Sequence, residues 1–360
     1  MKDVEILAAI SQLERERGVS RDALFEALEA ALLSAYRKNY GTTQNVRIQV
    51  MRDTGKIRVL SRRTVVEKVT DPKTEISLEQ AREKDPSYKV GDVVEEEIAA
   101  EGFGRIAAQT AKQVVIQKLR EAERGMIYEE FASREGDVVT GIVARIEGRT
   151  VIVDLGRVEG IIPPQEQVKG EKLTQGERIK AYIVEVKKTS KGPEIILSRT
   201  HPGLLKRLFE LEVPEINDGV VEIRAIAREP GSRSKVAVRA TLPEVDALGA
   251  CVGPRGSRVQ SVVQALKGER IDIIEWDEDP AKFVANALSP ARVIKAEVFP
   301  ESKLARVIVP DYQFSLAIGK EGQNARLAAK LTGWKVDIRP ESQAKSLKDD
   351  PERPAKQGRA

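Results

Sequence analysis

Two short glycine-framed loops carry the residue types in this chain best suited to holding a phosphate backbone. The first loop is Gly253-Pro254-Arg255-Gly256, and the second is Gly319-Lys320-Glu321-Gly322. Glycine has no Cβ, so a sugar-phosphate chain could approach the loop backbone closely. A helix is expected to start after each loop, and its free N–H groups and positive dipole end would face a phosphate. The sequence therefore predicts an anion-binding loop that occurs twice.

The side chains near these loops add charge and hydrogen-bonding groups. Arg255, Arg258 and Lys320 supply positive charge, and the helix after the second loop opens with amides and an arginine that could reach base edges. The predicted nucleic-acid contacts are Gly253, Pro254, Arg255, Gly256, Arg258, Ile318, Gly319, Lys320, Glu321, Gly322, Gln323, Asn324 and Arg326. The alternative interpretation is a pair of helix corners capped by glycine, with no ligand.

The elements around the two loops repeat in the same order. Each repeat is expected to hold a helix, two strands, a second helix, the loop, a third helix and a final strand, over residues 201–277 and 278–340. This order resembles the type II KH module, whose G-x-x-G loop clamps about four nucleotides of single-stranded nucleic acid. Two linked clamps would give a site of about eight nucleotides and a gain of roughly 10²–10⁴ in affinity.

The segment before the repeats, residues 127–200, reads as a small β-barrel. Five short strands separated by glycine-containing turns are expected at 137–146, 150–155, 158–162, 178–186 and 194–198. This pattern resembles an OB fold. OB barrels bind single strands by stacking bases on aromatic side chains. Tyr182 is the only aromatic residue in the expected strands, so we expect weak RNA binding by the barrel alone.

Residues 1–126 form a further α/β unit in this interpretation. A helix over 22–36 precedes strands at 46–51, 56–60 and 63–69, and a long helix is expected from about 105 to 124. Arg105, Gln109 and Lys112 would share one face of that helix. The fold class is therefore multidomain α+β: an α/β N-terminal domain with a long helix, a barrel at 127–200, two KH-like domains at 201–277 and 278–340, and a disordered tail at 341–360.

Composition excludes several classes of function. His201 is the only histidine and Cys251 the only cysteine among 360 residues, so a Cys/His zinc site cannot form, and we expect no catalytic triad, which would have to use His201. No phosphate-binding P-loop motif is present. We expect no enzyme activity, no cofactor and no metal. The chain also lacks a signal peptide and an apolar run long enough to span a bilayer, which favours a cytoplasmic protein.

The complete order of segments resembles the NusA family of bacterial transcription elongation factors. The resemblance covers about residues 1–340 and places an N-terminal domain, an S1 domain of OB fold and two KH domains in the family's order. The matching stretches are Phe25-Glu26-Ala27-Leu28, Gln109-Thr110-Ala111-Lys112-Gln113-Val114, residues 143–163 and residues 244–260. The chain departs from some members by ending soon after the second KH domain, without acidic C-terminal repeats. Residues 149–151 also lack the aromatic side chain that S1 domains often carry there.

The resemblance implies a function and partners. The N-terminal domain would bind core RNA polymerase near the RNA exit channel, while the S1 and KH domains would hold single-stranded nascent RNA. The expected effects are on pausing, intrinsic termination and antitermination, with other antitermination factors as further partners. Arg105 and Lys112 would face an emerging RNA hairpin. We expect a monomer.

Two other classes of protein remain open at this point. Polynucleotide phosphorylase, an enzyme that degrades RNA, also carries KH and S1 domains, but in the opposite order and after a catalytic core larger than residues 1–126. Some ribosomal proteins contain a KH fold, so a ribosome-associated binding protein is the third possibility.

Overall fold

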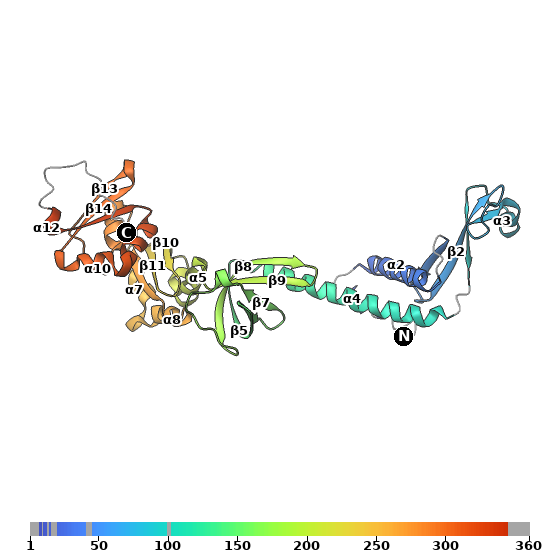
Figure 1. The fold of residues 1–360 in the computed structure, drawn as a ribbon, viewed down its shortest axis with the longest axis horizontal. Coiled ribbons are helices and arrows are strands. Elements are labelled where there is room, and N and C mark those ends of the chain that lie inside the picture. Colours follow the sequence, from blue (N-terminus) through green and yellow to red (C-terminus); the bar gives the residue numbers. More distant parts are fainter. Residues whose placement is uncertain are drawn as a thin grey trace. The chain divides into compact units, whose positions relative to one another are not determined.

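The chain consists of two compact units that divide between Glu129 and Glu130. A computed structural model describes residues 7–8, 10–12, 14–15, 20–40, 45–98 and 102–344. The two units are shown in Figure 1 and are described here one at a time.

The first unit places two helices against a small sheet. Helix α2 (Arg21–Tyr40) is followed by β1 (Val46–Val50), β2 (Ile57–Val66), β3 (Glu75–Ser77), α3 (Leu78–Lys84), β4 (Val93–Glu97) and α4 (Phe103–Ala132). Strand β2 pairs with all three other strands, antiparallel to β1 and β4 and parallel to β3. Buried residues of α2, among them Phe25, Leu28 and Leu32, pack with Ala107 and Ala111 of α4.

Three predictions for this unit need correction. The strands expected at 56–60 and 63–69 are one continuous strand, β2, because Ser61 pairs with Val46 of β1 and with Glu96 of β4 instead of forming a turn. Strands β3 and β4 were not predicted, and helix α4 runs eight residues further than the predicted end at residue 124. The amphipathic face expected on α2 is confirmed.

The second unit begins with a closed five-stranded barrel. Strands β5 (Val138–Glu147), β6 (Thr150–Asp154), β7 (Glu159–Ile162), β8 (Arg178–Thr189) and β9 (Gly192–Ser198) join in the order β5-β6-β7-β9-β8. All pairs are antiparallel except β7 with β9. The five predicted strands are all present, because glycine-containing turns separate short runs of alternating apolar residues.

The first KH-like domain contains α5 (Pro202–Glu212), α6 (Pro214–Asn217), β10 (Val221–Glu229), β11 (Arg233–Ala240), α7 (Ala247–Val252), α8 (Ser257–Ala265) and β12 (Arg270–Glu275). The second contains α9 (Pro280–Ala287), β13 (Lys295–Phe299), β14 (Leu304–Val309), α10 (Phe314–Ile318), α11 (Gln323–Thr332) and β15 (Lys335–Pro340). In each domain the middle strand pairs antiparallel with the first and parallel with the last. Apart from the short helix α6, the predicted elements are present in the predicted order.

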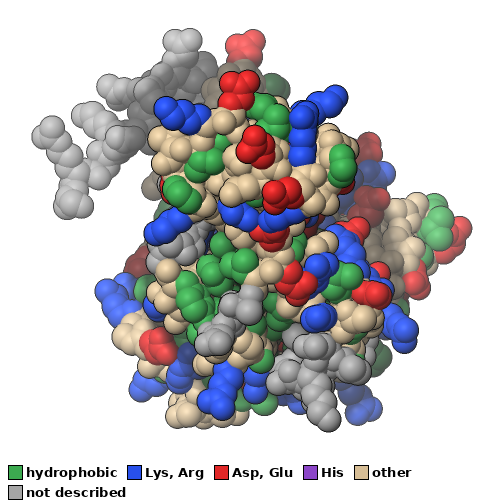
Figure 2. All heavy atoms as spheres, turned by 90° about the vertical axis from the view of Figure 1, so that its right-hand side faces the viewer, with side chains coloured by type: hydrophobic (Ala, Val, Ile, Leu, Met, Phe, Trp, Pro, Cys, Tyr) green, Lys and Arg blue, Asp and Glu red, His purple; other side chains and the backbone are tan. Residues whose placement is uncertain are grey.

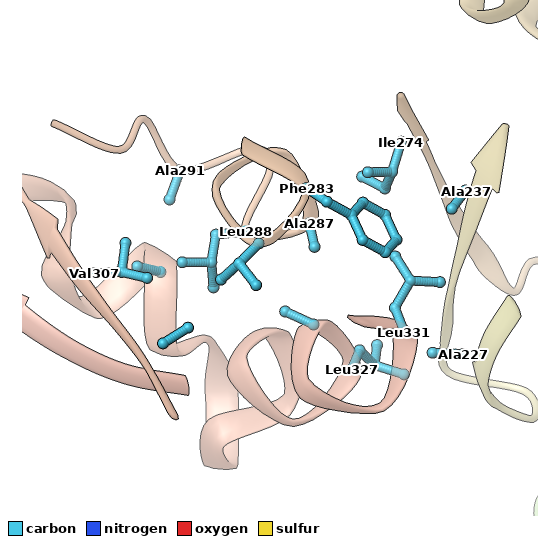
Figure 3. Close-up of a cluster of buried hydrophobic side chains, with 14 of the residues drawn as sticks. Ala227, Ala237, Ile274, Phe283, Ala287, Leu288, Ala291, Val307, Leu327 and Leu331 are labelled. Carbon is cyan, nitrogen blue, oxygen red and sulfur yellow. The ribbon is translucent and has the colours of Figure 1, made fainter. Parts of the chain in front are cut away.

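The hydrophobic core of the second KH-like domain extends onto the sheet of the first. Apolar side chains on the β10–β12 sheet pack against helices α9 and α11 of the second domain. Figure 3 shows this junction, with Phe283 and Leu331 lying beside Ala227, Ala237 and Ile274. Lys235 is fully buried there, and its Nζ donates to the Ser289 carbonyl oxygen, 2.7 Å away, and to Asp272. The four-residue connection between the domains is thus reinforced by packing.

A buried arginine joins the barrel to the first KH-like domain. The Arg199 side chain is 1% exposed and pairs with the carboxylate of Glu171. Its guanidinium also donates to the carbonyl oxygens of Lys180, in the barrel, and Ala265, at the end of α8. Because a buried charge must be paired and hydrogen-bonded, these contacts fix the end of the barrel against α8.

The tail prediction needs a partial correction. Residues 341–344 form a short helix, α12 (Glu341–Ala344), whereas the rest of the predicted disordered tail, 345–360, lies outside the described residues. No helix in the described part of the chain is long and apolar enough to cross a membrane. On the face drawn in Figure 2, Lys and Arg side chains are interspersed with Asp and Glu.

Candidate nucleic-acid interface

The two glycine loops have the same backbone conformation. The φ and ψ angles are 74° and 172° at Gly253 and 77° and 171° at Gly319. The third loop residue is left-handed in both copies, with φ of 53° at Arg255 and 54° at Glu321. The fourth residue is left-handed as well, at Gly256 and Gly322. Two loops that differ in both middle residues therefore keep one shape.

The two glycines of each loop have different roles. A Cβ on Gly319 would lie 2.8 Å from the backbone nitrogen of Asn324, and one on Gly253 would lie 2.6 Å from Cγ of Arg258. The first glycine is therefore required for packing inside the protein. A Cβ on Gly256 or Gly322 would meet nothing within 4 Å. The second glycine instead borders open space, where an approaching chain can lie.

Each loop leads directly into a helix that has no side-chain cap. Gly256 precedes α8 and Gly322 precedes α11, and neither helix start receives a side-chain hydrogen bond. The N–H groups of a first helical turn have no partner within the helix. Together with the helix dipole they can bind an anion. The loops and the helix starts thus form two matching corners whose geometry is suited to a phosphate.

Arg255, Lys320 and Glu321 are exposed at these corners. No carboxylate in the described part of the chain forms an ion pair with Arg255 or Lys320, so both can contact a phosphate. Pro254 is also exposed, whereas Ile318, which ends α10, is half-buried next to the loop. The structure places these predicted residues beside the open space at the second glycine of each loop.

The structure corrects the prediction that Asn324 contacts nucleic acid. Its side chain is 1% exposed, and its Nδ2 donates to the carbonyl oxygens of Leu288 and Ala317, both 3.0 Å away. It therefore lies in the core and cannot reach a base edge. Arg258 occupies the same place after the first loop and donates to the Ala250 carbonyl oxygen and to Glu215. This position ties each helix to the helix before the loop, so Arg258 is held within its domain.

Gln323 and Arg326 contact the first KH-like domain. The Arg326 Nε lies 2.6 Å from Oε1 of Glu229, and Gln323 Nε2 donates to Oε2 of Glu229 and to Ser232 Oγ. Arg326 also donates to the Glu321 carbonyl oxygen, which keeps it beside the loop. Glu229 and Ser232 were not predicted, since polar residues at a β10–β11 turn give no local signal of a contact with α11.

The remaining candidates differ in how far they are buried. Cys251 is fully buried at the end of α7, and this burial raises the pKa of its thiol to about 12. Tyr182 stacks on His201 with ring centroids 4.5 Å apart, at the junction of the barrel and α5. The one aromatic residue of the barrel strands is therefore engaged inside the protein. In the first unit, Arg105 and Lys112 are exposed on α4, opposite the buried Ala107 and Ala111.

Taken together, these features define a class of protein. A closed OB-type barrel followed by two KH-like domains, each with an uncapped helix start at a G-x-x-G loop, is the architecture of a protein that binds single-stranded RNA. No group of His, Cys, Asp and Glu side chains suited to a metal ion occurs in the described residues.

Comparison with known proteins identifies the family. Four family models match: the NusA N-terminal domain over residues 5–125, the S1 RNA binding domain over 133–199, the NusA-like first KH domain over 199–276 and the NusA-like second KH domain over 280–346. The chain belongs to the NusA family of transcription termination/antitermination proteins. It is 60% identical over 343 residues to such a protein from Halalkalibacterium halodurans, covering 95% of this chain and 90% of the relative.

A second relative agrees with this assignment. The transcription termination/antitermination protein NusA of Bacillus subtilis is 57% identical, with 95% of this chain and 92% of the relative covered. The solution structure of the N-terminal domain of that organism's NusA is 54% identical, and the match covers 34% of this chain and 98% of the solved one, with a TM-score of 0.32. The chain is thus a transcription termination/antitermination factor with RNA-binding S1 and KH domains, as the sequence predicted.

Proposed function

We propose that this factor binds core RNA polymerase through its N-terminal domain and nascent RNA through its KH loops. Holding RNA where it leaves the polymerase would favour hairpin growth, which lengthens pauses and alters intrinsic termination and antitermination. The action is positional and requires no catalysis, cofactor or metal. We further propose that it acts as a monomer, within which residues 1–126, 127–200, 201–277 and 278–340 are the working domains, and that other antitermination factors join the complex.

The repeated loop geometry is the observation that supports RNA capture. Two corners with the same φ and ψ angles, open space at the second glycine and an uncapped helix start lie in one compact unit. Because the two domains pack against each other, both corners can engage one strand without the flexibility of a free linker. The proposed contact residues are the loop residues 253–256 and 319–322.

RNA binding can be tested with the full chain and a labelled single-stranded RNA of about ten nucleotides. If three to five phosphates are neutralised, the slope of log K against log salt should be about −2 to −3.5. A slope near zero would refute the proposal. Incubation of the same RNA with inorganic phosphate tests the enzyme alternative, and intact RNA is the expected result.

The proposed hairpin contact involves two cations on helix α4. Arg105 and Lys112 are exposed, and no described carboxylate pairs with either of them. The double variant Arg105→Ala/Lys112→Ala should shorten the pause at a hairpin-dependent site while polymerase binding is kept. Lys68→Ala/Lys89→Ala, which removes the same charge from exposed positions outside α4, is the matched control. An equal loss in both double variants would contradict this role.

A further inference from the structure

The two RNA-binding corners share a backbone but differ in charge. Arg255 and Glu321 occupy the same left-handed position of their loops, with φ and ψ of 53° and 26° in the first and 54° and 27° in the second. Both side chains are exposed. Since the loops superimpose in their dihedral angles, a cation at one corner is replaced by a carboxylate at the other.

A second carboxylate reaches the second corner from the neighbouring domain. Glu229, at the end of β10, binds Arg326 with both oxygens, at 2.6 Å from Nε and 3.2 Å from the second terminal nitrogen. It also accepts a hydrogen bond from Gln323 at 2.8 Å. Arg326 and Gln323 both lie in the first turn of α11. A carboxylate held bidentately by arginine uses the donors that a phosphate would use.

The charge of Glu229 is retained near neutral pH. The hydrogen bond from Arg326 holds the pKa of this carboxyl below its ordinary value, and Gln323 contributes in the same direction. At the first corner the position equivalent to Arg326, four residues after the loop, is Gln260. Gln260 is uncharged, so the first corner has no cation at this position for a carboxylate of the other domain to pair with.

The net formal charge of the first corner is higher than that of the second by one unit. At the first corner Arg258 is paired with Glu215, which leaves Arg255 with no described partner. At the second corner Arg326 is paired with Glu229, and the charge of Lys320 is offset by its neighbour Glu321. Counted over the loop, the first turn of the following helix and their ion-pair partners, the first corner carries one net positive charge and the second is balanced.

We propose that Glu229 and Glu321 keep the second KH corner near electrical neutrality, so that the first corner supplies most of the phosphate attraction. The inference rests on the proposed RNA binding by the loops and specifies how that binding is divided. The second corner would then hold RNA chiefly by backbone hydrogen bonds and shape. Its contact with a strand would be weak and readily reversed, while the first corner anchors the RNA.

The test is salt-dependent binding of a labelled ten-nucleotide single-stranded RNA to the full chain and single variants. Glu229→Gln frees Arg326 from its ion pair, and Glu321→Gln removes the negative charge next to Lys320, so each should raise affinity about two- to fivefold, the range of one exposed charge contact. Each should also steepen the salt slope by about 0.7, the value for one more phosphate on a single strand. Arg255→Gln should weaken binding and reduce the slope by about 0.7. Lys320→Gln should lower the RNA affinity and the salt slope by less than Arg255→Gln does.

Glu222→Gln is the matched control, because Glu222 is also a β10 glutamate paired with an arginine, Arg224, and is not bound to a loop helix. Its RNA affinity should equal that of the wild type. Unchanged affinity in Glu321→Gln and Glu229→Gln, with equal losses in Arg255→Gln and Lys320→Gln, would overturn the inference. Weaker binding in Glu229→Gln without stronger binding in Glu321→Gln would show that Glu229 only positions the domains, and would overturn it too. Failure of the wild type to bind RNA would instead refute the proposed function.

Discussion

Replacing the second glycine of both loops should abolish RNA binding while leaving the fold intact. In Gly256→Asp/Gly322→Asp each new Cβ meets nothing within 4 Å. The remaining cost is the left-handed backbone, with φ of 78° and 73°, which is about 1–2 kcal/mol per position for an L-residue and is among the lowest for Asp. A domain stability of about 5–15 kcal/mol tolerates this cost.

The effect on RNA should be much larger than the effect on stability. Each Asp places a negative charge and a side chain in the space through which a phosphate would approach. Losing one corner removes the gain from linkage, roughly 10²–10⁴ in affinity, and losing both removes the corners themselves. We therefore expect the double variant to bind the ten-nucleotide RNA at least about a hundredfold more weakly than the wild type.

A control pair is available at the opposite ends of the same helices. Gly268 and Gly333 also have positive φ, 95° and 75°, and open space around a Cβ. Gly268→Asp/Gly333→Asp thus adds the same charge and similar backbone strain away from the loops. Circular dichroism and thermal unfolding should show both double variants folded, and fluorescence anisotropy should show RNA binding only in the control. Wild-type affinity in a folded Gly256→Asp/Gly322→Asp protein, or an equal loss in the control, would refute the assignment of the loops.

Four other predictions concern stability and reactivity. Gly319→Ala should lower the stability of the second KH domain by more than about 1–2 kcal/mol, because strain at positive φ adds to the contact with Asn324, and denaturant unfolding of this variant and of Gly322→Ala would measure the difference. Asn324→Ala should cost about 1–3 kcal/mol by leaving buried carbonyl oxygens without a donor, and an unfolding midpoint equal to that of the wild type would contradict the burial. Cys251 should resist a thiol reagent at pH 8 in the native protein and react in denaturant, since its pKa is about 12; rapid native reaction would contradict this. The hydrogen bond from Arg326 lowers the pKa of Glu229. The ion pair therefore stabilises the fold above the ordinary carboxyl pKa of 4.5, and this stabilisation is lost as the pH falls below 4.5. The difference in unfolding free energy between the wild type and Glu229→Gln should therefore shrink between pH 6 and pH 3.

The local sequence pattern was sufficient to predict most of the helices and strands. The barrel strands and the KH elements are short segments bounded by glycine and proline, so their limits can be read to within a few residues. The N-terminal unit was harder. Strand β2 contains Ser61, Arg62 and Arg63, which resemble a turn in sequence, and only pairing with β1 and β4 on its two edges makes the segment one strand.

The site was predictable in its backbone and less so in its side chains. The loop glycines and the exposed Arg255 and Lys320 follow from local sequence and helix chemistry. The burial of Asn324 does not, because its partners Leu288 and Ala317 belong to other helices of the domain. The Glu229 contact joins residues 97 positions apart along the chain, and such a pairing depends on how two domains pack.

We propose above that the factor binds polymerase with its N-terminal domain and nascent RNA with its KH loops. Polymerase binding tests this proposal most directly, since it joins the RNA-binding unit to transcription. Purified core RNA polymerase would be mixed with the full chain, residues 1–129 and residues 130–360, which follow the division of the structure into two units. We predict that the full chain and residues 1–129 bind polymerase and that residues 130–360 bind RNA. Failure of both the full chain and residues 1–129 to bind polymerase, with association of the full chain with ribosomes instead, would contradict it.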